Sequence, residues 1–150
     1  LEDPKALRVS RDNSPQAAAA YLQALAEATA DVDFDEQNFQ GVLDDPATFP
    51  AAVASGSVYD AIDRLRSLTV PSDMLRFHQL HIAGLFEVAN LSAIAGKIDQ
   101  SADLEKQKPM LQEQYYHISV IQKIQQELEK ELSALAPKYQ SELDNYSKGR

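Results

Sequence analysis

The sequence contains no cysteine and no tryptophan, and only 5 of its 150 residues are glycine. Without cysteine the chain has no disulfide, no thiolate zinc site, no c-type haem attachment and no cysteine nucleophile. No glycine-rich phosphate loop in G-x-G-x-x-G order occurs. No apolar run approaches the ~18–20 residues that a membrane-spanning helix needs. What remains has the composition of an average globular domain, with 44% hydrophobic and 25% charged residues.

Positive charge is also scarce, because 14 Lys and Arg face 23 Asp and Glu and give a net charge of -9. No cluster of basic residues offsets this balance. Nucleic acid and anionic lipid surfaces are bound mainly through Lys and Arg, so we expect neither as a partner. A protein partner is the remaining expectation.

Helical spacing dominates the chain, and no strand-like alternation, hairpin turn or fixed-period repeat appears. Asn13 or Ser14 predicts the cap of a first helix, with Pro15 at its first position. The remaining segments are an N-terminal tether at 1–13, a short helical connector at about 33–49, helices at about 50–68, 72–98 and 102–146, and a frayed tail at 147–150. We therefore expect one domain over 14–146.

The helix over 72–98, with Ser72 as its cap, is apolar on most of its circumference. A helix of this kind is buried by its neighbours. Only a narrow strip of this helix is polar and is expected to face solvent, and it consists of Arg76, Gln79, Glu87, Asn90 and Lys97. The predicted fold class is all-α, an up-and-down bundle of four main helices with a short helical connector, in which helix 72–98 is central and buried.

The three histidines, His78, His81 and His117, all fall on apolar faces of these helices. Buried imidazoles need hydrogen-bond partners, and backbone carbonyls, Tyr21, Tyr115, Ser92 or a buried water would serve. A second hypothesis makes the three histidines metal ligands, although their spacing matches neither the zinc-protease nor the di-iron helix pattern. A third makes them a pH switch.

A haem is a further form of the metal hypothesis, with Met74 or Met110 as a thioether ligand. Arg76-Phe77-His78 and Tyr116-His117 resemble the corresponding parts of cytochrome b-type four-helix bundles. The sequence departs from that pattern because its first helix has no methionine near its start. We therefore expect no cofactor.

Other candidate sites are weaker. No Gly-x-Ser-x-Gly elbow surrounds a serine, and paired acids such as Asp44-Asp45 are typical of a turn. One ring of the pair Tyr115-Tyr116 is expected to face the core. For Tyr116, Tyr139 and Tyr146 the favoured interpretation is isolated surface aromatics, and the alternative is a partner patch.

The turn Val70-Pro71-Ser72 leads into the helix that carries His78, and the segment SPQAAAAYLQALAEA carries Tyr21. This arrangement resembles uncharacterised extracytoplasmic bacterial helical-bundle domains, in which a Val-Pro turn opens a helix with an early histidine. The resemblance spans residues 14–135. It implies a periplasmic or cell-surface location, and no activity comes with it.

Together these patterns predict a non-enzymatic extracytoplasmic interaction or structural domain that forms part of a surface assembly. The alternative is a metal- or haem-binding bundle that uses His78, His81 and His117.

Overall fold

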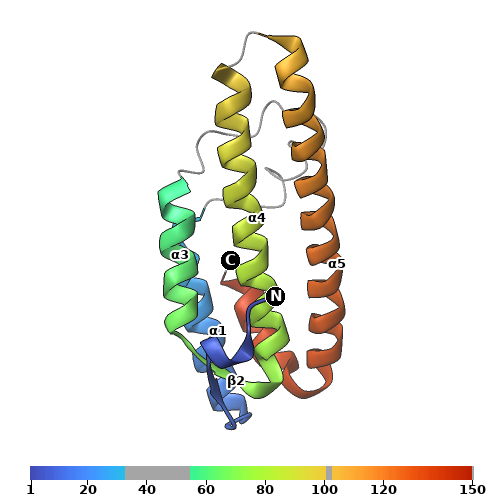
Figure 1. Cartoon of the computed structure of the whole chain (residues 1–150). Coiled ribbons are helices and arrows are strands. Elements are labelled where there is room, and N and C mark those ends of the chain that lie inside the picture. Colours follow the sequence, from blue (N-terminus) through green and yellow to red (C-terminus); the bar gives the residue numbers. More distant parts are fainter. Residues whose placement is uncertain (33–54, 101–102, 150) are drawn as a thin grey trace.

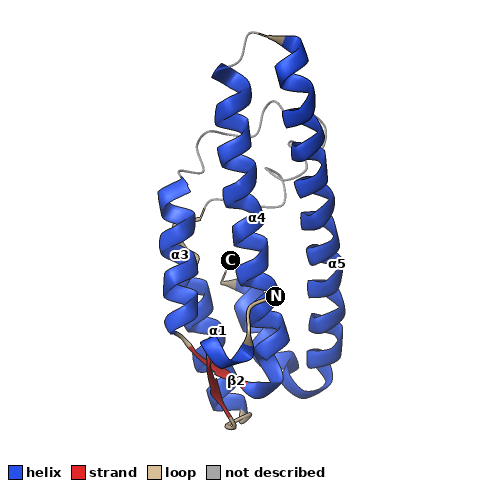
Figure 2. Ribbon diagram, in the orientation of Figure 1, coloured by secondary structure: helices blue, strands red, loops and turns tan. Residues whose placement is uncertain are grey.

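The computed structural model describes residues 1–32, 55–100 and 103–149, and these residues are mostly helical (Figures 1 and 2). Their helices pack as a bundle, so the predicted all-α class is confirmed. The main elements are α1 (Pro15–Ala28), α3 (Ser55–Ser67), α4 (Leu75–Gln100) and α5 (Leu104–Lys148). The predicted connector and the predicted start of the second helix lie outside the described residues. None of the helices in the described part is long and apolar enough to cross a bilayer.

The start of α1 follows the sequence signal. Ser14 is the N-cap, its side chain accepts a hydrogen bond from the Ala17 amide, and Pro15 occupies the first turn, where a missing N–H costs nothing. The buried face of α1 consists of Ala18, Tyr21, Leu22, Leu25 and Ala28.

Helix α4 lies between α3 and α5 and packs against both (Figure 1). Its buried residues include Phe77, Leu80, Ile82, Val88 and Leu91. The predicted solvent strip is wrong at two positions. The Gln79 side chain is buried, and its amide donates to the Glu2 carbonyl at 2.6 Å. The Glu87 carboxylate points towards His117 on α5 and forms a hydrogen bond with it.

Helix α5 runs back along α4 and then bends sharply at its lower end in Figure 1, so that its last segment lies against α1. The bend occurs at Tyr139, whose φ of -126° and ψ of 29° are not helical. Pro137, which removes one backbone hydrogen bond and crowds the turn before it, lies two residues before this bend. Pro109 also lies inside α5, but no non-helical angles accompany it.

The first residues differ from the predicted tether. Pro4–Ala6 form a 3-10 helix (η1), and Arg8–Ser10 form β1, which pairs in parallel with β2 (Thr69–Pro71). Leu7 between them is buried in the core. No strand was expected from the sequence, since three residues are too few to display an alternating pattern.

A second 3-10 turn, η3 (Ser72–Met74), precedes α4. The predicted cap at Ser72 is wrong, because the cap comes from elsewhere in the chain. The Asn13 side chain accepts from the Asp73 amide at 2.9 Å and donates to the Ser72 hydroxyl at 2.8 Å. Asn13 thereby holds the end of the N-terminal segment against the start of α4.

Candidate functional site

Tyr21 of α1 and His78 of α4 form a hydrogen-bonded pair inside the core. The Tyr21 hydroxyl lies 3.1 Å from His78 Nδ1, and the His78 side chain is fully buried. The two rings meet edge to face, with centroids 5.7 Å apart. Residues 57 positions apart thus fix how α1 and α4 pack.

The charges of this pair are set by burial. Burial lowers the pKa of His78 from 6.5 to about 4, although the nearby Glu2 carboxylate and the Leu65 backbone act in the opposite direction. Burial also raises the pKa of Tyr21 well above 10, and the neighbouring Tyr146 adds to this rise. At neutral pH both groups are therefore uncharged, and the tautomer of the His78 ring sets which of them donates the hydrogen bond.

The second ring nitrogen of His78, Nε2, is buried, and within the described residues it makes no hydrogen bond of regular geometry. The Leu65 backbone of α3 is nevertheless close enough to raise the pKa of His78. The arrangement links α1, α3 and α4 at one point. It gives His78 the structural partner that the sequence predicted, namely Tyr21.

His81 lies one turn further along α4 and is only partly buried. Its Nδ1 is 2.9 Å from the Phe77 carbonyl of the preceding turn, and its ring packs on the Phe77 ring with centroids 4.4 Å apart. His81 also lines an apolar pocket of about 230 Å³ between α1, α4 and α5. Its backbone-carbonyl contact is of the kind that the sequence predicted.

His117 of α5 lies between two carboxylates. Its Nδ1 pairs with Glu87 of α4, and its Nε2 is 3.8 Å from Glu113, one turn earlier on α5. The Glu87 and His117 side chains are both largely shielded from solvent. Sequence reasoning placed Glu87 in water and missed this pair, because the partner lies 30 positions away.

The three histidines thus have three separate sets of partners, and the structure does not bring them together. In residues 1–32, 55–100 and 103–149, no group of three or more His, Asp or Glu side chains is arranged to hold a metal ion. The serines singled out in the sequence bond to protein groups. Ser92 and Ser119 each donate to a backbone carbonyl of the preceding turn.

The tyrosine predictions are partly wrong. Tyr115 was expected to face the core, but it is 59% exposed, and Tyr116 beside it is 64% exposed. Tyr139 was expected on the surface, yet it is completely buried, and its hydroxyl donates to the Asn13 carbonyl at 2.8 Å and to Asp73 at 2.9 Å. The predicted patch of Tyr116, Tyr139 and Tyr146 therefore does not exist in that form.

Asp73 is the centre of a polar cluster at the base of the bundle. It accepts from Lys138 at 2.6 Å as well as from Tyr139, and these two donors lower its pKa. The cluster joins the N-terminal segment, the start of α4 and the bend of α5. No sequence motif announces it, because its members come from three distant parts of the chain.

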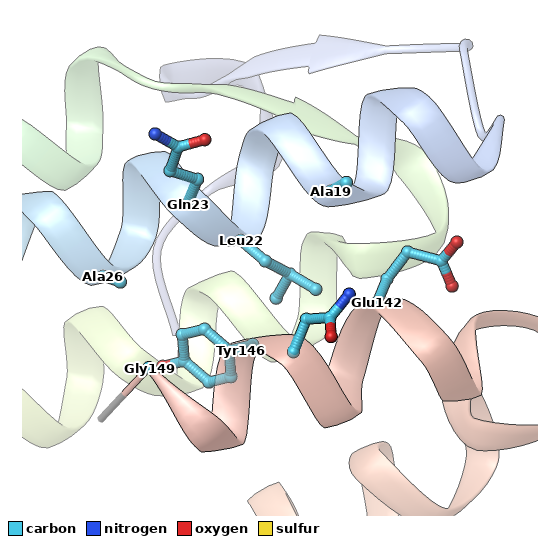
Figure 3. Close-up of a pocket in the computed structure, with 8 residues that line it drawn as sticks. Ala19, Leu22, Gln23, Ala26, Glu142, Tyr146 and Gly149 are labelled. Atoms are coloured by element: carbon cyan, nitrogen blue, oxygen red, sulfur yellow. The ribbon is translucent and has the colours of Figure 1, made fainter.

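A second pocket, of about 310 Å³, lies between α1 and the last segment of α5 (Figure 3). Leu22 lines it from α1 and Tyr146 lines it from α5, and the small side chains of Ala19 and Ala26 leave space on the α1 side. Its lining offers one carboxylate, Glu142, and no nucleophile paired with a base. The pocket is therefore an apolar groove, and the residues that line it do not form a catalytic arrangement.

No protein-family model, curated protein or solved structure matches this chain. Function must therefore be argued from the surface and the buried groups themselves.

Proposed function

We propose that the chain is a non-enzymatic, extracytoplasmic domain, an up-and-down bundle of four main helices, that binds a partner protein through the outer face of α5. The observation that carries this proposal is the exposed pair Tyr115 and Tyr116. Tyrosine is enriched in protein interfaces and in their energetically dominant positions, because it offers a large ring and a polar hydroxyl together.

The fold holds these two rings outside the core. Gln114 and Ile118 on the same helix are buried, so the rotation of α5 about its axis is fixed and the tyrosines cannot turn inward. Within the described residues, the Tyr115 side chain makes no hydrogen bond or ring contact. The Tyr116 ring lies edge to face with the ring of its neighbour His117, with centroids 5.4 Å apart. These two aromatic side chains therefore contribute little to the packing of the bundle.

The charge around the pair indicates the kind of partner. Lys108 lies two turns before Tyr115, and Lys123 lies two turns after Tyr116, on the same face of α5. Both lysines are exposed, and in the described part of the chain neither has an ion pair. A partner surface with an apolar centre and an acidic rim would pack on the two tyrosine rings and form ion pairs with the two lysines.

The experiment places a photo-crosslinking phenylalanine derivative at residue 116 of the full-length protein in its native cells, with residue 129 as the matched control. Glu129 is exposed on the same helix and lies away from the tyrosines. We expect one protein to crosslink from residue 116 and not from residue 129. The purified partner should then bind the variant Y115S/Y116S at least about tenfold more weakly than the wild type, as expected for a hot spot.

Two results would overturn this proposal. Identical crosslinks from residues 116 and 129 would show that contact is nonspecific, and unchanged affinity of Y115S/Y116S would show that the tyrosines do not contribute. A crosslink to a second copy of the chain would replace the foreign partner with self-association, which light scattering at increasing concentration measures independently.

The metal- or haem-binding alternative stays a prediction. It is tested by metal analysis and an absorbance spectrum of protein expressed with added iron, zinc and a haem precursor. About one equivalent of metal or haem, lost in His78→Gln, would support it.

A further inference from the structure

The two-stranded sheet leaves one edge of β1 without a neighbouring strand in the described residues. β1 pairs with β2 in the register Arg8 to Thr69, Val9 to Val70 and Ser10 to Pro71. β2 also packs on α1, so β2 lies between β1 and the bundle. In Figure 3 the pale violet arrow of β1 is outermost, followed by the pale green arrow of β2 and then by α1.

This edge is accessible and carries an apolar side chain. Val9 is 41% exposed, and Arg8 beside it is exposed as well. The outward N–H and C=O groups of an edge strand are a template for another strand, which is why proteins normally shield such edges. Two strands of three residues each also form a smaller sheet than is usual, so one added strand would extend it.

The edge is held in place at both ends. Before β1, Glu2 pairs with Arg66 of α3, and its carbonyl accepts from Gln79. After β1, the Asn13 side chain is bonded to Ser72 and Asp73. A strand that is already ordered loses little conformational freedom on binding, which favours affinity.

Charge identifies the kind of segment that fits. Lys5, Arg8 and Arg11 are all exposed around β1, and within the described residues none of them forms an ion pair. Elsewhere in the described structure, five cations pair with carboxylates, namely Arg64, Arg66, Arg76, Lys130 and Lys138, and five exposed lysines do not, namely Lys97, Lys106, Lys108, Lys123 and Lys148. Three unpaired cations within seven residues of a chain with net charge -9 point to an anionic occupant.

We propose that the outer edge of β1 binds an extended acidic segment of a partner protein by strand addition. Backbone hydrogen bonds to β1 supply the pairing, acidic side chains of the segment meet Arg8 and Arg11, and an apolar side chain lies beside Val9. This inference does not depend on the Tyr115–Tyr116 surface, since it uses a different element and a different mode of recognition.

The test uses two synthetic peptides of alternating glutamate and valine. One has an ordinary backbone, and the other is N-methylated at every second residue, which removes the donors needed for strand pairing and keeps the charge. Binding to the full chain is measured by fluorescence anisotropy, and the site is mapped by amide chemical shifts in NMR. We expect the ordinary peptide to bind with shifts at Arg8–Ser10, and the methylated peptide to bind at least about tenfold more weakly.

The variant R8E/R11E should also weaken binding at least about tenfold, whereas the control K106E/K148E, which lies outside both proposed surfaces, should leave it unchanged. All four positions are exposed, so the thermal midpoint of each variant is a check that folding is intact. Equal binding of the methylated peptide would reduce the site to simple charge attraction and overturn strand addition. Absence of peptide binding, or chemical-shift changes confined to other elements, would overturn the site itself. Displacement of the peptide by inorganic polyphosphate at an equal concentration of charge would also overturn it.

Discussion

Protonation of His78 should destabilise the folded protein as the pH falls from 6.5 towards 4. Burial lowers the pKa of His78 to about 4, against 6.5 for an exposed histidine. Between these values the unfolded chain binds a proton that the folded protein does not bind, so unfolding becomes more favourable as the pH falls. The stabilisation is complete above pH 6.5 and is lost by pH 4. The difference between the two pKa values corresponds to about 3 kcal/mol.

The assay is urea unfolding followed by far-ultraviolet circular dichroism between about pH 7.5 and pH 5. Above pH 5 the carboxylates whose pKa values are lowered, such as Asp73 and Glu127, remain charged and do not contribute to the slope. Over the part of the window from pH 6.5 to pH 5, we expect the free energy of unfolding to fall by about 2 kcal/mol.

Two variants decide whether His78 is responsible. His78→Gln removes the titrating group, so its free energy of unfolding should change much less over this interval. His81→Gln is the matched control on the same helix, because it keeps His78 and Tyr21, so the slope that His78 causes should persist. A flat profile in the wild type, or an unchanged slope in His78→Gln, would refute the reasoning.

Three further predictions concern stability. Tyr21→Phe leaves the buried Nδ1 of His78 without its hydrogen-bond partner and should cost about 1–3 kcal/mol in urea unfolding; a loss below about 0.5 kcal/mol would mean that the hydrogen bond is unimportant. Tyr139→Phe removes a hydroxyl that donates to two acceptors, so amide hydrogen exchange should accelerate in the last segment of α5 more than in α4, and uniform acceleration would contradict this. Gly84→Ala should stabilise the protein by about 0.5–1 kcal/mol, because the new methyl would lie 3.7 Å from Ile124, an ordinary contact; a lower thermal midpoint would count against this packing.

Local signals predicted the helical elements well. Ser14 and Pro15 mark the start of α1 in a way that no tertiary contact alters, and Pro137 marks the bend of α5 within two residues. The partnership of Tyr21 with His78 was one of several predicted from the rule that buried imidazoles need hydrogen-bond partners, and the structure selects it.

The errors arose where a polar residue is buried or a partner is distant. The buried face of α5 includes Gln114, so a face drawn through apolar residues alone placed Tyr115 in the core. Gln79 was assigned to solvent because its partner, the Glu2 carbonyl, belongs to a segment 77 positions away. Periodicity records which side of a helix is apolar, but it contains no information about which polar group meets which across the fold.

The hydrogen bond from Tyr139 to Asn13 spans 126 positions, nearly the whole chain. Most helical bundles fold quickly because their contacts are local, whereas this closure brings the two ends of the fold together and requires a large loop to form. During synthesis, α1, α3 and α4 can emerge and associate, but the base of the bundle cannot close until the last turns of α5 have left the ribosome. Until that moment the apolar face of α1 that the last segment covers is open to water, which makes the incomplete chain the form most exposed to aggregation and to proteases.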